Sequence, residues 1–190
     1  MKYCVNDEVY EPSDDSALLL EIVEAVKGEK ALEVGSGSGI ISVKLAKLGA
    51  EVVSVDINPW ASLATKLTGR LNGVDVNVVN CDLSSCFRDQ EFDLSVFNPP
   101  YLPFQEIRSW IDYAWSGGKS GIEVLVAFLR TVKAKRYYFV YSSLSDFDTL
   151  HEELKALRLE IVKSIHKTIG YETIFAVEAR PYDQGGSGRA

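Results

Sequence analysis

The chain has 190 residues, a net charge of −7 and a pI near 4.9, with 46% hydrophobic and 25% charged residues. These values are ordinary for a single globular domain that buries a full hydrophobic core. They exclude a transmembrane helix, because no apolar run approaches the roughly 20 residues that a bilayer requires. The acidic N-terminus is unlike a signal peptide, and the acidic charge argues against a large nucleic-acid interface. We therefore expect a cytoplasmic protein that binds neither membranes nor nucleic acid.

The cysteines and histidines do not predict a metal centre or a disulfide framework. Cys4, Cys81 and Cys86 are too few and too irregularly spaced for either, and His151 and His166 stand alone in the sequence. A disulfide between Cys81 and Cys86 is compatible with their spacing, but the spacing alone does not favour it. We expect no metal.

Strand and helix patterns alternate regularly after an irregular lead-in over residues 1–12. A helix is expected from Ser13, its N-cap, to Gly28, which ends it. The next strands are expected at Lys30–Val34, Glu51–Asp56, Val74–Asn80 and Phe92–Phe97, with helices Gly39–Leu48 and Pro59–Leu71 between the first three. A long loop then leads to helix Ile122–Val132, strand Tyr137–Ser142, helix Phe147–Leu157 and strands Leu159–His166 and Glu172–Ala179.

This order predicts an α/β fold with a doubly wound, mostly parallel seven-stranded sheet and helices on both faces. The last two strands have only a short connection, so they should form an antiparallel hairpin at one side of the sheet. Residues 1–180 are expected to form one domain, and the Gly-rich, polar tail over 181–190 is expected to be disordered.

The stretch LEVGSGSGI, Leu32–Ile40, lies between the first strand and the following helix, where a doubly wound sheet binds its ligands. Glycines allow close backbone approach there, and the helix N-terminus offers unpaired N–H groups. The spacing does not fit the GxGxxG fingerprint of dinucleotide-binding proteins, because Ile40 holds the third glycine position. Asp56 closes the second strand, where a carboxylate can accept both hydroxyl groups of a ribose. The pattern favours a ribose-containing cofactor other than a dinucleotide.

A stiff corner, Asn98-Pro99-Pro100-Tyr101, ends the fourth strand beside the glycine loop. Proline lacks a backbone donor and restricts the preceding residue to extended conformations, so the corner should hold its carbonyls and the Asn98 amide in fixed positions. Alone, such a corner is more often a plain turn. Its position beside the glycine loop and behind Asp56 favours a binding site.

Glu33, Gly35, Gly37 and Gly39 form the pattern ExGxGxG, which resembles motif I of the Rossmann-like class I methyltransferases that use S-adenosylmethionine. An NPPY corner after it resembles the amino-methyltransferases that modify planar nitrogens, either adenine N6 or a glutamine side-chain amide. The chain from residue 3 to about 179 resembles the HemK/PrmC group of protein-glutamine methyltransferases, in particular its compact archaeal and eukaryotic branch. The most branch-specific stretches are VYEPSDDSALLLEIV (Val9–Val23) and AWSGGKSGIEV (Ala114–Val124).

The resemblance implies a catalytic role for the corner. The Asn98 side-chain oxygen and the Pro99 carbonyl would accept the N–H groups of the substrate amide. Tyr101 would stack on the planar group, and Pro100 would complete the substrate site. S-adenosylmethionine would leave as S-adenosylhomocysteine, with no metal and no ionised base. Catalysis would come from positioning and preorganised acceptors.

The resemblance also implies cofactor contacts outside the glycine loop. These come from Tyr10, Pro12 and Ser16 before the first strand, from Asp56 and Asn98, and from Asp82, which would accept from the adenine amino group. Ser16 occupies a place usually held by threonine and keeps the hydroxyl. For the segment before the first strand, the alternative is a helix cap alone.

The implied substrate is the glutamine of the GGQ motif in class I translation release factors. The implied partner is a small zinc-binding activator subunit that extends the sheet at its third strand. That edge would be Val74–Val79, which only Asp75 protects with charge; the alternative is an edge covered by the protein's own loop. The long loop Leu102–Gly118, with aromatic residues Phe104, Trp110, Tyr113 and Trp115, is expected to form part of the substrate groove.

Three other functions stay open. An adenine-N6 methyltransferase acting on DNA or RNA shares the NPPY chemistry but usually has a basic surface and a target-reading segment. A protein-lysine methyltransferase would need a deprotonated amine in the same pocket, and the polar acceptors suit an amide better. A cofactor-binding scaffold without turnover would be free to lose Asn98 and Tyr101.

Overall fold

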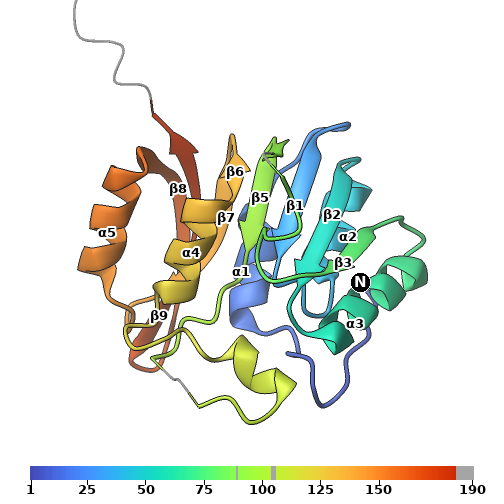
Figure 1. Cartoon of the computed structure of the whole chain (residues 1–190), viewed down its shortest axis with the longest axis horizontal. Coiled ribbons are helices and arrows are strands. Elements are labelled where there is room, and N and C mark those ends of the chain that lie inside the picture. Colours follow the sequence, from blue (N-terminus) through green and yellow to red (C-terminus); the bar gives the residue numbers. More distant parts are fainter. Residues whose placement is uncertain (89, 104–105, 183–190) are drawn as a thin grey trace, which may run out of the picture.

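The computed structural model describes residues 1–88, 90–103 and 106–182, and its centre is a seven-stranded sheet (Figure 1). The strand order is β3-β2-β1-β5-β7-β9-β8. The parallel strands are β1 (Lys30–Val34), β2 (Glu51–Asp56), β3 (Asn77–Asn80), β5 (Leu94–Phe97) and β7 (Tyr137–Ser142). β8 (Leu159–Ile169) and β9 (Glu172–Pro181) form the antiparallel hairpin. The predicted fold class is confirmed.

Helices cover both faces of the sheet (Figure 1). One face carries α1 (Asp14–Ile22), α2 (Ile40–Lys47) and α3 (Pro59–Leu71), and the other carries α4 (Glu123–Thr131) and α5 (Phe147–Ala156). β5 and β7 are buried at every position, as expected for central strands covered on both sides. In the described part of the chain, no helix is long and apolar enough to cross a membrane.

The direction of chain winding reverses between β1 and β5. From β1 the chain moves outward to β2 and β3, then returns to place β5 and β7 on the other side of β1. At such a switch point the loops after the two central strands diverge and leave a crevice at their carboxyl ends. The glycine loop follows β1 and the NPPY corner follows β5, so the winding brings the two motifs together.

Several boundaries differ from the sequence-based expectation. α1 ends at Ile22 rather than near Gly28, because Val23 is already extended and the Val26 N–H is bound by the Glu29 carboxylate. The strand expected at Phe92–Phe97 is interrupted at Asp93, which leaves a separate two-stranded sheet of β4 (Glu91–Phe92) and β6 (Lys133–Ala134).

At the sheet margins, β3 begins at Asn77 rather than Val74, so the outer strand is shorter than expected. β9 continues to Pro181, two residues past the expected end at Ala179. The rest of the expected tail, residues 183–190, lies outside the described residues, as does Phe104 in the long loop.

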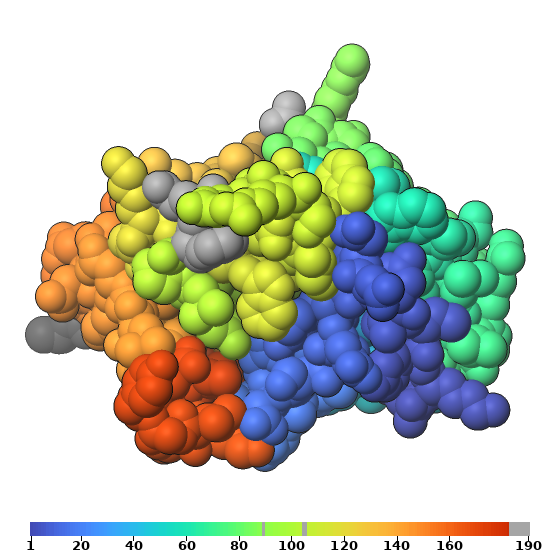
Figure 2. Space-filling model, turned by 90° about the horizontal axis from the view of Figure 1, so that it is seen from below, coloured from blue at the N-terminus to red at the C-terminus, as the bar shows by residue number. Residues whose placement is uncertain are grey.

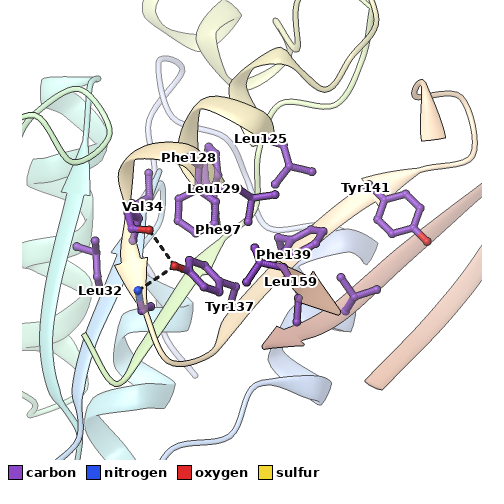
Figure 3. Close-up of a cluster of buried hydrophobic side chains, with 14 of the residues drawn as sticks. Leu32, Val34, Phe97, Leu125, Phe128, Leu129, Tyr137, Phe139, Tyr141 and Leu159 are labelled. Atoms are coloured by element: carbon purple, nitrogen blue, oxygen red, sulfur yellow. Dashed lines mark hydrogen bonds between the residues drawn. The ribbon is translucent and has the colours of Figure 1, made fainter. Parts of the chain in front are cut away.

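In the core under α4, the hydroxyl of Tyr137 is hydrogen-bonded both as a donor and as an acceptor (Figure 3). This hydroxyl donates to the Val132 carbonyl and accepts from the Ala134 N–H, both at 2.9 Å. The two bonds hold the turn from α4 into β7 while the Tyr137 ring packs at 6.0 Å from the ring of Phe128.

Replacing Tyr137 by Phe should therefore lower the free energy of unfolding by about 2 kcal/mol, because a buried donor and a buried acceptor lose their partner together. Urea denaturation measures this loss. The matched control is Tyr138→Phe, since the Tyr138 hydroxyl is buried with no hydrogen-bond partner among the described residues. Equal losses in the two variants would show that the Tyr137 bonds contribute nothing specific.

Candidate active site

A cavity of about 490 Å³ opens at the carboxyl ends of β1, β2, β3 and β5, on the side of the molecule that faces the viewer in Figure 2. Most of the predicted site residues line it. These are Tyr10, Ser16, Glu33, Gly35, Gly37, Asp56, Asp82, Asn98, Pro100 and Tyr101. Pro12, Gly39 and Pro99 are not among the residues that line the cavity. The switch point thus gathers residues from six separate segments of the chain into one site.

The glycine loop forms the floor of the cavity. Gly35 has a φ of 60°, and a Cβ there would lie 2.8 Å from the ring of Phe97 on β5. Gly39 has a φ of 79°, and a Cβ there would lie 2.7 Å from the Cα of Thr65 on α3. Neither position can hold a side chain without displacing a neighbour. Gly39 serves the packing of α2 against α3.

Asp56 sits at the end of β2 with its carboxylate turned toward the glycine loop. Its Oδ2 accepts from the Gly37 N–H and its Oδ1 from the Asn58 N–H, both at 2.9 Å. Burial raises the pKa of Asp56 to about 6, although these two hydrogen bonds oppose the shift. The carboxylate is therefore ionised at neutral pH, and each oxygen keeps a free lone pair for a ligand hydroxyl.

Asp82 is exposed on the segment after β3 and lines the same end of the cavity as Asp56 and Ile57. The residue before it, Cys81, forms a disulfide with Cys86. This pairing was not favoured by the spacing of the cysteines, because the tight turn that joins them is set by the loop after β3 and not by a sequence signal.

A buried carboxylate that the sequence analysis missed organises the opposite end of the cavity. Asp15, in the first turn of α1, is only 3% exposed. It accepts from the hydroxyl of Tyr10 at 3.1 Å, from that of Tyr101 at 3.2 Å and from the backbone N–H of Ser16. Burial, reinforced by the Asp15 charge, raises the pKa of Tyr10 and of Tyr101, so both phenols stay protonated and keep donating.

The NPPY corner is fixed from both sides. The Asn98 side-chain N–H donates to the hydroxyl oxygen of Ser16 at 3.5 Å, and the Tyr101 carbonyl accepts from the Ser145 hydroxyl at 3.3 Å. Gly121 packs so closely that a Cβ there would lie 2.4 Å from the Tyr101 oxygen. The Asn98 side-chain oxygen is buried and has no hydrogen-bond partner among the described residues.

Residues of the long loop lie on the outer side of the cavity. Trp110, Tyr113 and Trp115 all line it, and the ring of Trp115 meets that of Tyr10 edge to face at 5.0 Å. The short 3₁₀ helix η1 (Trp110–Ala114) is held down by Glu8, whose carboxylate accepts from the Trp110 N–H at 3.0 Å. Sequence reasoning missed Glu8 because its partner is 102 residues away.

The charges around the cavity have one sign. Its acidic lining residues are Glu8, Asp15, Asp56 and Asp82, with Glu33 buried beneath them, and no lysine, arginine or histidine is found among the described lining residues. A cavity of this kind attracts a cationic ligand and repels phosphate groups.

Glu33 lies beneath the glycine loop, 4% exposed, and accepts from the Ser42 hydroxyl. Burial raises the pKa of Glu33 to about 8, although the Ser42 bond opposes the shift. In an unfolded chain a glutamate has a pKa of about 4.3, so between these values the folded protein binds the extra proton. Protonation of Glu33 therefore contributes to the free energy of unfolding. This contribution is fully present below about pH 4 and is lost as the pH rises toward 8.

Glu33→Gln removes this titration while keeping an acceptor for Ser42. The melting temperature of the variant relative to the parent protein should increase steadily from pH 5 to pH 8. Scanning calorimetry of both proteins without ligand, at matched ionic strength, measures the difference. Parallel melting curves over this range would mean that Glu33 does not titrate there.

Comparisons with known proteins agree with this geometry. The family model "Methyltransferase small domain" matches residues 11–111. The chain is 36% identical over 188 residues to "Putative protein N5-glutamine methyltransferase MJ0928" of Methanocaldococcus jannaschii, covering 94% of this chain and 95% of that protein. It is 36% identical over 186 residues to human methyltransferase HEMK2, covering 88% and 87%.

Among solved structures, the Mtq2–Trm112 complex of E. cuniculi, described as methylating the termination factor eRF1, matches with a TM-score of 0.75. It covers 92% of this chain and 99% of that one at 24% identity, so it supports the fold. The family model and the two relatives extend over most of the sequence. The chain belongs to the methyltransferase small domain family, in its compact HemK-like group of protein-glutamine methyltransferases.

Proposed function

We propose that this enzyme methylates the side-chain amide nitrogen of the glutamine in the GGQ motif of a class I translation release factor. S-adenosylmethionine would be the methyl donor and S-adenosylhomocysteine the product. The observation that carries the proposal is the buried, unpartnered side-chain oxygen of Asn98. Leaving such an acceptor unpaired costs about 1–3 kcal/mol. A substrate amide N–H would remove that cost.

The cavity residues fit this cofactor. Its sulfonium and ammonium groups are both cationic, and they suit a cavity whose charged residues are all acidic. Asp56 has the free lone pairs to accept the ribose hydroxyls, and Asp82, which lines the cavity, would accept from the adenine amino group. Tyr10, Ser16 and the loop Gly35–Ser38 complete the lining. Pro12 and Gly39, which do not line the cavity, would support these residues rather than touch the cofactor.

When bound, S-adenosylmethionine supplies a methyl group activated by its sulfonium. The protein's task is to present the amide, a poor nucleophile because its lone pair is delocalised. Asn98 Oδ1 would accept one amide N–H, and the carbonyl of Pro99, which lies between the lining residues Asn98 and Pro100, would accept the other and so fix the plane of the amide. Pro99 acts only through this backbone carbonyl. Tyr101, held by Asp15, presents its ring to the planar group. No ionised base is needed, since the nitrogen releases its proton to solvent after methylation.

The choice of a protein substrate rests on charge and on the relatives. The acidic lining disfavours a nucleic-acid strand, whose phosphates it would repel. Schizosaccharomyces pombe mtq2, 27% identical over 200 residues, is named the catalytic subunit of an eRF1 methyltransferase. An amide in a protein loop therefore suits the site better than an adenine in DNA or RNA.

The partner is proposed to bind at the β3 edge of the sheet. β3 is the outermost strand on its side and Val79 is exposed. Beside it, α3 presents an exposed apolar stripe at helical spacing, formed by Trp60, Leu63, Leu67 and Leu71. An unpaired strand next to an apolar helix face suits a partner that adds a strand and covers the stripe. The Mtq2–Trm112 complex supports a partner subunit, and the family resemblance implies that this subunit is small and binds zinc.

The proposed function is tested by incubating the chain with S-adenosylmethionine and a release factor, with and without the small partner. Fragmentation mass spectrometry of the GGQ peptide then locates any added methyl group. One methyl on the glutamine nitrogen is expected, and a DNA oligonucleotide in a parallel reaction should stay unmodified. Methyl found on adenine, or on a lysine of the factor and not on the glutamine, would refute the proposal.

Asn98→Ala should lower the transfer rate at least about 100-fold, the usual effect of deleting one preorganised hydrogen-bonding group. Its affinity for S-adenosylmethionine should stay close to that of the parent protein. Asp56→Ala should show the contrasting effect, because it should weaken the binding of S-adenosylmethionine. Radiolabelled methyl transfer and calorimetric titration separate the two effects. Near-normal turnover by Asn98→Ala would show that the side chain of Asn98 has no catalytic role.

Leu67→Glu should weaken binding of the small partner at least about tenfold, because it places a charge in the middle of the apolar stripe. The fold should survive, since the Leu67 side chain is exposed. Val162→Glu, at a somewhat more exposed apolar site on β8 at the opposite sheet edge, serves as control. If calorimetry gives the same affinity for both variants, the partner binds elsewhere.

A further inference from the structure

The β8–β9 hairpin ends in a turn with an unusually exposed aromatic residue. Gly170, with a φ of 63°, and Tyr171 form the two-residue turn between the strands. The Tyr171 side chain is 90% exposed, and Ile169 before the turn is 42% exposed. Nothing in the fold requires a tyrosine here, because this position of a tight hairpin turn is usually polar.

The tip lies at the active-site edge of the sheet. β9 is antiparallel to β7, so its first residues lie beside the carboxyl end of β7, with Ser142 opposite Ile174. Figure 2 looks onto this edge and shows the hairpin, in red, projecting beside the yellow-green segment that follows β5. The tip is thus on the same side of the molecule as the mouth of the cavity.

Two polar contacts hold the tip against the site. Lys167 on β8 pairs with Asp14 at 2.7 Å, and Asp14 precedes Asp15, the buried carboxylate of the cavity. Glu172 at the start of β9 accepts from the Ser142 hydroxyl at 2.6 Å. Glu172 is also near enough to Tyr101 that its charge adds to the effects of burial and of Asp15 in raising the Tyr101 pKa. The tip is therefore a fixed neighbour of the NPPY corner.

The segment that leaves β7 carries two further exposed apolar side chains, Leu144 and Phe147. The Phe147 ring packs at 5.7 Å from Tyr141, whose ring stacks in turn on Phe175 of β9 at 4.9 Å. The stack of Phe147, Tyr141 and Phe175 lies on the α5 side of the sheet, whereas Ile169 and its partner Glu172 lie on the α1 side with Ile174.

We propose that the hairpin tip, Ile169 and Tyr171, is the docking surface for the protein substrate, with Tyr171 as its main contact. The inference rests on the proposed function and adds the surface that would select the substrate. Exposed aromatic and aliphatic side chains suit protein side chains, and tyrosine is among the residues that dominate protein interfaces. The neighbouring carboxylate of Glu172 would repel a phosphate backbone. The occupant is the chain segment that flanks the target glutamine.

The test is the double variant Ile169→Thr/Tyr171→Ser, which keeps Gly170 and residues compatible with a strand and a turn. The intact release factor is titrated into it calorimetrically, with the small partner and S-adenosylhomocysteine present. Its dissociation constant should rise roughly tenfold over that of the parent protein. In turnover, KM for the factor should rise while kcat and the affinity for S-adenosylmethionine stay unchanged. Val26→Ser is the matched control. Val26 is an exposed apolar residue just before β1, at the amino end of the parallel strands and so on the side away from the cavity.

Binding and turnover separate the two claims. Equal dissociation constants for the parent protein and the double variant, or no binding of the factor by either, would overturn the docking surface. A fall in kcat with unchanged KM would also overturn it, since the tip would then act on the chemistry and not on docking. Tight, tip-dependent binding without methylation of the glutamine would overturn the proposed function alone.

Discussion

Folded proteins seldom leave a buried carbonyl oxygen without a hydrogen-bond donor, because this lowers their stability. Here the side-chain oxygen of Asn98 is such a group. The surrounding structure prevents simple relief. The Asn98 amide nitrogen is engaged with Ser16, the following prolines restrict the backbone, and Gly121 and Ser145 hold the Tyr101 carbonyl. The corner is thereby kept in a conformation that a planar N–H donor would complete, and the proposed site would be formed before substrate arrives.

The buried carboxylate of Asp15 makes that preparation possible. It ties Tyr10, from the segment that covers the cavity, to Tyr101, from the corner that ends β5. It also orients Ser16, which in turn holds Asn98. The switch point of the sheet gathers these segments in space, and one carboxylate fixes their relative positions. An acidic cavity lining then gives the same site its preference for a cationic cofactor.

Local patterns allowed much of this to be predicted from sequence. The glycine loop, Asp56 and the NPPY corner each follow a strand end, and strand ends are set by short-range signals. The sequence analysis missed the role of Asp15, because an acid in the first turn of a helix is expected for its interaction with the helix dipole alone. Its partner Tyr101 is 86 residues away in the sequence. Glu8 and the Cys81–Cys86 pair escaped for the same reason: their roles depend on how loops fold back, which periodicity does not encode.

The most direct test is a crystal structure of the protein with S-adenosylhomocysteine and a glutamine-containing peptide from the release factor. The account predicts the glutamine amide nitrogen about 3 Å from Asn98 Oδ1, with the Tyr101 ring against the amide plane. It would be contradicted by an amide bound away from Asn98. It would equally be contradicted by an Asn98 side chain whose nitrogen, rather than its oxygen, faces the substrate.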